Sequence, residues 1–210
     1  MVYFVVETIA PEGYKKSNKT YSFSITENGA RVFVDDIKNP PIKGNVSVLK
    51  IDSLTKEQLK GAEFIVYNDV DKDGLITDGI DTVYGVMLHD EGYRYYLNDL
   101  PYGEYVLKET KAPDGFELDE NAYPFEIVEN GDVRNIETLA GVGFINDAQK
   151  GDLVITKRSS DKKLEGFSFR ITGKAVTGQE YDQTFKTDEQ GKIEITGLRI
   201  GTYTVSEIAD

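Results

Sequence analysis

The chain has 210 residues, no cysteine and a formal net charge of −13 at neutral pH. The lack of cysteine excludes disulfides and thiolate metal sites, and the acidic balance argues against binding nucleic acid, whose phosphates require a basic surface. Apolar residues make up 39% of the sequence, which is enough for small packed cores, yet no apolar run approaches the length of a membrane span. We therefore expect no membrane insertion of this fragment.

A strand-like segment that ends in glutamate occurs three times. The pattern Tyr-x-x-x-Glu stands at residues 3–7, 105–109 and 203–207, and the first two copies continue into Ala-Pro-x-Gly. Side chains alternate along a strand, so the glutamate shares the face of the tyrosine. A carboxylate on an apolar face costs free energy unless it is neutral or paired. The alternative is a strand-end glutamate that already turns into solvent.

Two further patterns repeat at a similar spacing. Residues 46–50 and 153–157 are strand-like segments that end in lysine, and each is followed by Leu-x-Gly-x-x-Phe. Residues 31–39 and 142–146 are predicted strands that end in asparagine. The two lysines lie 107 residues apart, and so do the two asparagines. A period near one hundred residues indicates a tandem array of whole domains.

The order of these patterns divides the chain into one complete repeat and two partial ones. Residues 1–42 hold the C-terminal half of a domain, 43–147 a complete domain, and 148–210 the N-terminal part of another. The chain is therefore expected to be a fragment of a longer protein. Within the complete repeat, alternation and turn residues predict strands near 46–51, 63–67, 82–88, 93–97, 104–109, 123–128, 133–138 and 142–146.

So many short strands in about one hundred residues indicate an antiparallel β-sandwich. The fold class expected for the whole chain is all-β, with tandem antiparallel sandwiches, one complete and two partial. No stretch has sustained helical periodicity, although residues 55–59 are compatible with a single helical turn.

A repeat places a lysine, a glutamate and an asparagine in phase with apolar residues. A lysine in apolar surroundings loses its proton more easily and becomes a nucleophile. A glutamate there tends to keep its proton, so it can donate a hydrogen bond and move protons. Attack of the amine on the asparagine amide releases ammonia and leaves an isopeptide crosslink, and the fold supplies the proximity. The alternative is a buried Lys–Glu ion pair beside a hydrogen-bonding asparagine, and the spacing leaves both open.

The combination of motifs resembles the Cna B-type domains, also called SpaA-like or prealbumin-like, of Gram-positive pilins and cell-wall adhesins. The resemblance rests on the lysine strand, on Leu-x-Gly-x-x-Phe, on the Gly-x-Tyr-x-x-x-Glu-x-x-Ala-Pro-x-Gly box and on the final Phe-x-Asn. It implies sandwiches of the inverse transthyretin or immunoglobulin kind and an autocatalytic isopeptide bond. By position, Lys50 is the amine, Asn146 the acceptor amide and Glu109 the catalytic carboxylate.

The same resemblance assigns residues of the partial repeats to incomplete sites. Glu7 and Asn39 match the catalytic and acceptor positions of one site, and Lys157 and Glu207 match the amine and catalytic positions of another. Residues 1–42 contain no lysine strand and 148–210 contain no asparagine strand, so a single bond is expected.

An acidic insertion at residues 67–81 matches the first half of an EF-hand calcium loop, with Gly74 at the sharp turn. It departs from the pattern because Ile80 occupies the position of the bidentate glutamate. The candidate ligands for Ca²⁺ are Asp69, Asp71, Asp73, the carbonyl of Leu75, Asp78 and Asp81. The alternative is a solvated acidic hairpin loop.

The predicted function is that of a stalk or backbone fragment of a Gram-positive surface adhesin or pilin. We expect an extracellular protein, anchored to the cell wall through segments absent from this chain, with neighbouring domains as its partners. No external substrate is expected, and Ca²⁺ is the one candidate cofactor. The alternative is an adhesin module that recognises a host protein or glycan, for which Tyr93, Tyr95, Tyr96 and Tyr102 form a candidate aromatic patch.

Overall fold

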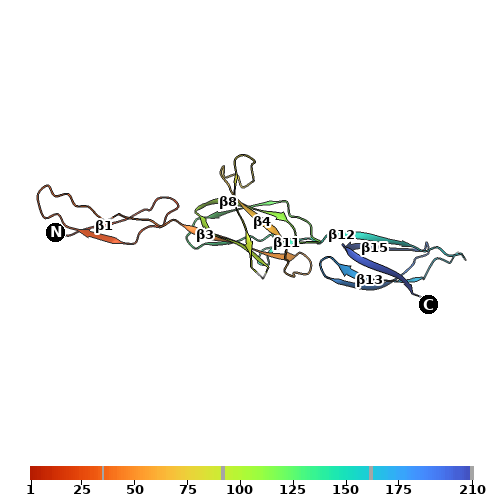
Figure 1. Cartoon of the computed structure of the whole chain (residues 1–210). Coiled ribbons are helices and arrows are strands. Elements are labelled where there is room, and N and C mark those ends of the chain that lie inside the picture. Colours follow the sequence, from red (N-terminus) through yellow and green to blue (C-terminus); the bar gives the residue numbers. More distant parts are fainter. Residues whose placement is uncertain (35, 91–92, 161–162, 209–210) are drawn as a thin grey trace. The chain divides into compact units, whose positions relative to one another are not determined.

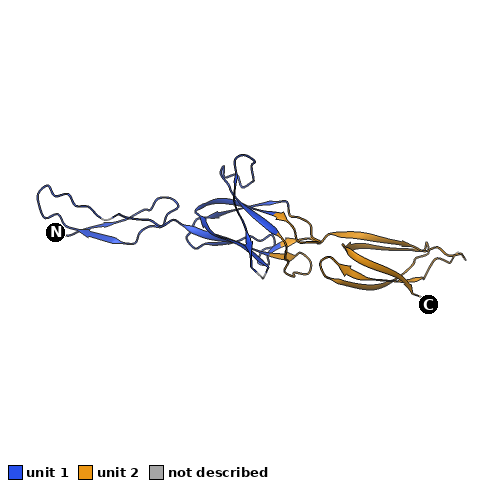
Figure 2. Ribbon diagram, viewed as in Figure 1, with its two compact units in different colours: residues 1–49, 63–109, 120–144 blue, residues 50–62, 110–119, 145–210 orange. Residues whose placement is uncertain are grey.

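The computed structural model describes residues 1–34, 36–90, 93–160 and 163–208, and these ranges contain sixteen strands and no helix. Within them there is accordingly no helix that is long and apolar enough to span a membrane. The chain forms two compact units (Figure 2). Unit 1 comprises residues 1–49, 63–109 and 120–144, and unit 2 comprises residues 50–62, 110–119 and 145–210.

Two sheets form the sandwich of the complete repeat, mostly within unit 1 (Figure 1). The first has the order β10 (Val133–Asn135), β3 (Lys43–Asp52), β7 (Arg94–Pro101), β6 (Leu88–His89), with β11 (Phe144–Asn146) also paired to β3. The second has the order β5 (Thr82–Val86), β4 (Glu63–Asn68), β8 (Gly103–Lys111), β9 (Ala122–Ile127). β10 and β3 pair in parallel, whereas β3–β7, β6–β7, β4–β5 and β8–β9 are antiparallel.

The core of unit 1 is formed by apolar side chains on the inward faces of its strands. Val46 and Val48 of β3 are at most 1% exposed, and Phe64 of β4 is wholly buried. The Phe64 ring lies 5.1 Å from the ring of Tyr95 and 5.3 Å from that of Phe144, edge to face in both contacts. Each such side chain stabilises the folded state by about 1.5–3 kcal/mol when fully buried.

The first partial repeat, in unit 1, contains a hairpin of β1 (Tyr3–Val6) and β2 (Thr20–Phe23), in which the rings of Tyr3 and Phe23 stack at 5.4 Å. The strand predicted at residues 31–39 is wrong: residues 31–34 and 36–39 form no strand, and Asp35 lies outside the described residues. A strand is stable only beside a paired neighbour. In β11 that neighbour is β3, and residues 1–42 contain no equivalent lysine strand.

Unit 2 holds the second partial repeat. β12 (Lys150–Thr156) pairs with β15 (Lys192–Arg199), and β13 (Ser168–Ala175) lies between β14 (Glu180–Lys186) and β16 (Gly201–Ile208). All three pairings are antiparallel. The core cluster consists of Phe169, Ile171, Ile193 and Ile195. The all-β fold predicted from alternation is confirmed. Residues 55–59, whose sequence is compatible with a helical turn, form a non-helical loop in which Lys56 has a positive φ of 62°.

Candidate functional site

Lys50 is a completely buried lysine on β3. Its side chain is 0% exposed and shares a face with Val46 and Val48 of the core. Its backbone carbonyl accepts a hydrogen bond of 2.9 Å from the amide of Leu59. A fully buried lysine is rare because its ammonium form is poorly solvated away from water, so this position favours the neutral amine.

Asn146 ends β11, the strand that pairs with β3, and is 3% exposed. Its side-chain amide nitrogen donates a hydrogen bond to the backbone carbonyl of Glu117. The backbone carbonyl of Asn146 accepts a hydrogen bond of 3.0 Å from the backbone amide of Ser53. The segment after β3 therefore binds the end of β11 directly, and Lys50 and Asn146 lie on neighbouring strands.

Glu109 lies near the end of β8 and is 0% exposed. It is in phase with Tyr105 and Leu107, which are 3% and 0% exposed. Burial, helped by the neighbouring Tyr84, raises the pKa of Tyr105 to about 12. That shift indicates how weakly charge is solvated on the inward face of β8. The glutamate thus points into the apolar side of its strand, as the sequence phase predicted, instead of turning into solvent.

In the first partial repeat, the catalytic and acceptor positions are in direct contact. The amide nitrogen of Asn39 donates one hydrogen bond of 2.7 Å to Oε2 of Glu7 and another of 2.8 Å to the carbonyl of Lys15. The same Glu7 oxygen accepts a 2.5 Å hydrogen bond from the amide of Ser17. In this copy, the glutamate carboxylate and the asparagine amide are therefore joined by a direct hydrogen bond.

In the second partial repeat, the amine and catalytic positions are in contact. Nζ of Lys157 lies 2.6 and 2.8 Å from the two carboxylate oxygens of Glu207. It also lies 4.7 Å from the centre of the Phe167 ring, within reach of a cation–π interaction. The Lys157 side chain is 21% exposed and that of Glu207 is 44% exposed, whereas both equivalents in the complete repeat are fully buried.

Sequence reasoning missed two members of these sites, the carbonyl groups of Lys15 and Glu117. Each stands two residues after the glycine of an Ala-Pro-x-Gly box and accepts a hydrogen bond from the asparagine amide of its repeat. A backbone carbonyl has no side-chain signature, so residue type gives no signal. Their common offset from the box is the one feature of the sequence that points to them.

The acidic loop between β4 and β5 gathers three of the six predicted metal ligands. Asp69, Asp71 and Asp81 each offer a carboxylate oxygen, and these oxygens lie within 4.8 Å of one another. Asp73 is outside that group, and its carboxylate caps the amide of Leu75 at 2.8 Å. Leu75 and Asp78 are exposed.

Asp71 is surrounded by the like charges of the neighbouring aspartates. Partial loss of hydration, followed by repulsion from Asp73, Asp81 and Asp69, raises the pKa of Asp71. The carboxylate of Asp69 accepts hydrogen bonds from the amides of Asp73 and Gly74 at 3.1 and 2.9 Å. Oxygen ligands of this kind suit a hard divalent cation.

The tyrosines of the candidate aromatic patch divide between core and surface. Tyr95 is 3% exposed and packs on Phe64, and the hydroxyl of Tyr102 donates a hydrogen bond of 2.8 Å to Glu12. Two of the four are therefore occupied by internal contacts.

Residues 44–140 and 151–210 match the family of SpaA prealbumin-like fold domains, and the chain belongs to this family. The resemblance read from the motifs is thereby confirmed. Among solved structures, the chain is similar to the Bacillus anthracis TIE protein, with 28% identity and a TM-score of 0.76. That match covers 100% of this chain and 36% of the TIE protein chain, so this chain spans about a third of that relative.

Two other solved structures are more distant. The Streptococcal ancillary pilin is 19% identical, with a TM-score of 0.40, and the match covers 99% of this chain and 66% of that one. The shaft pilin SpaA from Lactobacillus rhamnosus GG is 15% identical, with a TM-score of 0.37, and the match covers 79% of this chain and 87% of that one. No curated protein matches the chain.

Proposed function

We propose that this chain is a stalk segment of a Gram-positive surface protein or pilin, and that an isopeptide bond between Lys50 and Asn146 locks its complete repeat. The observation that carries the proposal is the complete burial of a lysine and a glutamate, at 0% exposed, together with an asparagine at 3%. Burying these groups costs free energy, and residues that only pack the core would avoid that cost.

The partial repeats support the role of Glu109. In one copy the equivalent glutamate binds the asparagine amide, and in the other the equivalent glutamate binds the lysine amine. If both contacts are combined in the complete repeat, Glu109 stands between the Lys50 amine and the Asn146 amide. A group in that position can hold both reactants and pass protons from one to the other.

The proposed reaction is a transamidation without any external reagent. Neutral Nζ of Lys50 attacks Cγ of Asn146 and forms the new C–N bond, while Glu109 in its acid form donates a hydrogen bond to the amide oxygen. Glu109 then transfers a proton from the attacking nitrogen to the leaving nitrogen. The bond from Cγ to Nδ2 breaks, ammonia leaves, and the glutamate ends in the protonation state in which it began.

The product would tie the first strand of the repeat to its last. In the chain-entropy account, closing a loop of about one hundred residues contributes about 5 kcal/mol. Tension along the chain would also pass through a covalent bond instead of through the hydrogen bonds between β3 and its neighbours. A domain without cysteine would gain in this way the permanence that disulfides give other extracellular domains.

Location and partners follow from this proposal. Membership of the SpaA family over residues 44–140 and 151–210 supports an extracellular protein of the Gram-positive surface. We propose that other parts of the polypeptide anchor it to the cell wall and that its partners are the neighbouring repeats. A host protein or glycan would be an additional partner of such a stalk.

We also propose Ca²⁺ as a ligand of the acidic loop, through Asp69, Asp71 and Asp81. The support is the gathering of their carboxylate oxygens within 4.8 Å, at the position where the sequence matches half of an EF-hand loop. A bound cation would replace repulsion among these groups by attraction and hold the loop closed.

The experiment that tests the crosslink is intact mass under denaturing conditions. We expect the parent chain to weigh one ammonia less than its sequence, and Glu109→Gln to weigh its full sequence mass because it lacks the proton-transferring acid. Glu207→Gln is the matched control, since it removes the same carboxylate from an incomplete site, and we expect it to keep the mass deficit. A parent chain of full mass would contradict the crosslink.

A further inference from the structure

Both linkers between repeats are built into the same hydrogen-bonded arrangement. In the first, the amide of Lys15 donates to the carbonyl of Pro40 at 2.9 Å, and the amide of Ile42 donates to the carbonyl of Gly13 at 2.8 Å. The amide of Tyr102, which lies between β7 and β8 of the next repeat, donates to the carbonyl of Ile42 at 3.2 Å. The linker thus binds both the Ala-Pro-x-Gly box before it and the repeat after it, within unit 1.

The second linker repeats each of these bonds. The amide of Glu117 donates to the carbonyl of Asp147 at 2.8 Å, and the amide of Gln149 donates to the carbonyl of Gly115 at 2.8 Å. The amide of Ile200 donates to the carbonyl of Gln149 at 3.1 Å. All of these residues lie within unit 2. Equivalent residues form equivalent backbone hydrogen bonds in both linkers. This repetition indicates a specific joint between repeats instead of a chance contact.

A glycine is required in each joint for two reasons. Gly13 and Gly115 have positive φ angles of 78° and 84°, which other residues adopt only with strain. A Cβ on Gly13 would lie 3.4 Å from the ring-bearing carbon of Tyr102, and one on Gly115 would lie 3.1 Å from the methyl group of Thr177. In both joints, therefore, the glycine lets the next repeat approach the box closely.

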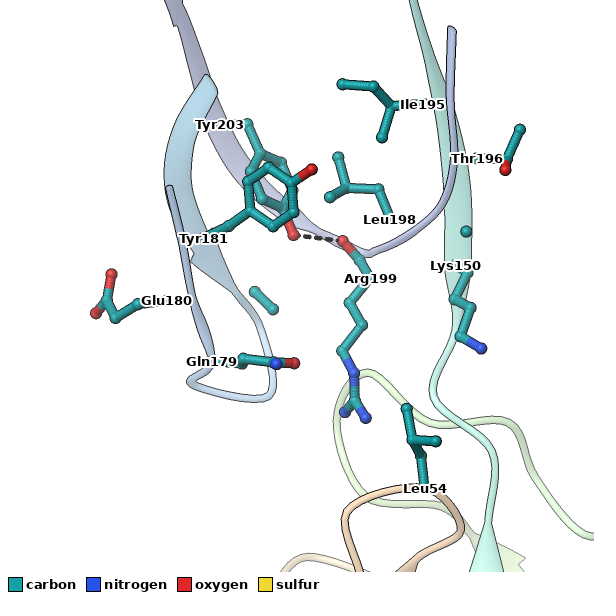
Figure 3. Close-up of a pocket in the computed structure, with 12 residues that line it drawn as sticks. Leu54, Lys150, Gln179, Glu180, Tyr181, Ile195, Thr196, Leu198, Arg199 and Tyr203 are labelled. Carbon is teal, nitrogen blue, oxygen red and sulfur yellow. Dashed lines mark hydrogen bonds between the residues drawn. The ribbon is translucent and has the colours of Figure 1, made fainter. Parts of the chain in front are cut away.

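The second joint carries an additional ion pair that is almost fully shielded from water. Nη1 of Arg199 lies 2.8 Å from Oδ2 of Asp52, and the two side chains are 10% and 3% exposed. The other oxygen of Asp52 accepts hydrogen bonds from the amides of Leu54 and Thr55 at 2.8 and 3.1 Å. Figure 3 shows the Arg199 side chain reaching out of its own strands towards Leu54, at one side of a cleft of about 260 Å³.

We infer that the turn before the strand that carries the glutamate (β8 or β16) is a docking surface. Its partner is the Ala-Pro-x-Gly box and the linker of the preceding copy of the repeat. The contacts of this surface come from Tyr102 in the complete repeat and from Ile200 in the next, and Arg199 adds an ion pair with Asp52 at the second joint. The joint restricts bending at the linker. This inference rests on the proposed stalk function and adds how that stalk resists bending.

The first experiment measures the spread of distances across the second joint. The chain has no cysteine, so Lys60→Cys in the complete repeat and Thr184→Cys in the next, both at exposed positions of unit 2, introduce two spin labels without background. Pulsed electron spin resonance on the parent should give a single narrow distance distribution. Arg199→Gln should widen it about twofold, because the buried carboxylate of Asp52 is left without its cation.

The matched control for that substitution is Arg170→Gln. It breaks an arginine–aspartate pair of 2.6 Å with Asp182, which is half-exposed and lies within one sheet of the same repeat. We expect the distribution to stay narrow in this variant. A broad distribution in the parent, or an equal width in both variants, would overturn the inference.

A second pair of variants tests the glycine approach in the same doubly labelled chain. Gly115→Val should broaden the distribution, whereas Gly131→Val has the same positive-φ strain, with φ of 84° and 83°, but no atom within 4 Å of its Cβ. Equal broadening by both variants would assign the effect to general destabilisation and contradict a joint.

Intact mass on every sample separates the joint from the crosslink. A broad parent distribution with one ammonia lost would reject the joint and leave the crosslink standing. A narrow distribution at full sequence mass would do the reverse.

Discussion

At the scale of single residues, the complete repeat differs from its partial copies in burial more than in composition. Lys50 and Glu109 are both 0% exposed, whereas Lys157 and Glu207 are 21% and 44% exposed and form an ordinary ion pair. In water-rich surroundings a lysine keeps its proton and is not a nucleophile. The chemistry we propose therefore depends on the closed sandwich around it, and the half-open copies illustrate the unreactive state.

The first prediction concerns Glu109→Gln. Without the acid the crosslink does not form, and the loss of about 5 kcal/mol should lower the melting temperature of the complete repeat by about 20 °C. Scanning calorimetry checks this value, and Lys157→Ala is the control because it removes a lysine from an incomplete site. An unchanged melting temperature in Glu109→Gln would argue that no covalent bond stabilises the parent.

The second prediction concerns pH and the pair of Asp52 and Arg199. Burial alone would raise the pKa of Asp52, but hydrogen bonds from Arg199 and from the amides of Leu54 and Thr55 outweigh it and hold the pKa below the ordinary 3.8. A carboxyl with a lowered pKa in the folded state stabilises that state above pH 3.8, and the contribution fades as pH falls through the lower, folded value.

Urea unfolding of the parent and of Asp52→Asn measures this contribution. We expect the parent to be more stable by about 2 kcal/mol at neutral pH, the value of a hydrogen bond to a charged group. The difference should shrink below pH 3.8. A difference that is constant down to pH 2.5 would contradict the assignment.

At the scale of elements, alternation predicted the strands of the complete repeat because each has one face in a core. β3, β4 and β8 fall within a few residues of the predicted ranges. The strand expected at residues 31–39 did not form, since its side-chain phase alone cannot replace a paired neighbour. β2 was missed because its four residues, Thr-Tyr-Ser-Phe, are too few to stand out.

The candidate site divides in the same way. The alternation of side chains along each strand predicted that Lys50, Glu109 and Asn146 lie on buried faces, because a period of two residues can be recognised in the sequence. The carbonyl of Glu117 and the pairing of Asp52 with Arg199 were not predicted. The first is backbone, and the second joins residues of different repeats that no local pattern relates.

The third prediction concerns the loop between β4 and β5. Calorimetric titration of chelator-treated protein with Ca²⁺ should release heat, and Asp81→Asn should weaken binding by at least about tenfold, since it removes one of three grouped charges. Asp78→Asn is the control and should bind like the parent because Asp78 lies outside the group. A parent that releases no heat would end the calcium proposal.

At the scale of the whole molecule, we propose one complete repeat that is closed covalently and is joined to its partial neighbours by hydrogen-bonded linkers. Family membership establishes the fold of residues 44–140 and 151–210, and the buried Lys50, Glu109 and Asn146 are the residues of the proposed crosslink. Such a chain should neither extend within a complete repeat nor bend freely between repeats.

The fourth prediction is mechanical. When the parent is pulled from its two ends, the segment between Lys50 and Asn146 should not lengthen, because tension bypasses it through the crosslink. In Glu109→Gln the same segment should unfold and add about 330 Å of contour length, from 96 residue steps at about 3.4 Å each. Single-molecule force spectroscopy distinguishes the two, and equal extension of both chains would contradict the lock.

The central claim is that Nζ of Lys50 is bonded to Cγ of Asn146, and the most direct measurement is tandem mass spectrometry of a complete proteolytic digest. We predict a branched peptide that contains both residues, with a mass one ammonia below the sum of its two arms. Recovery of the Lys50 and Asn146 peptides as separate linear species, each at its full sequence mass, would contradict it.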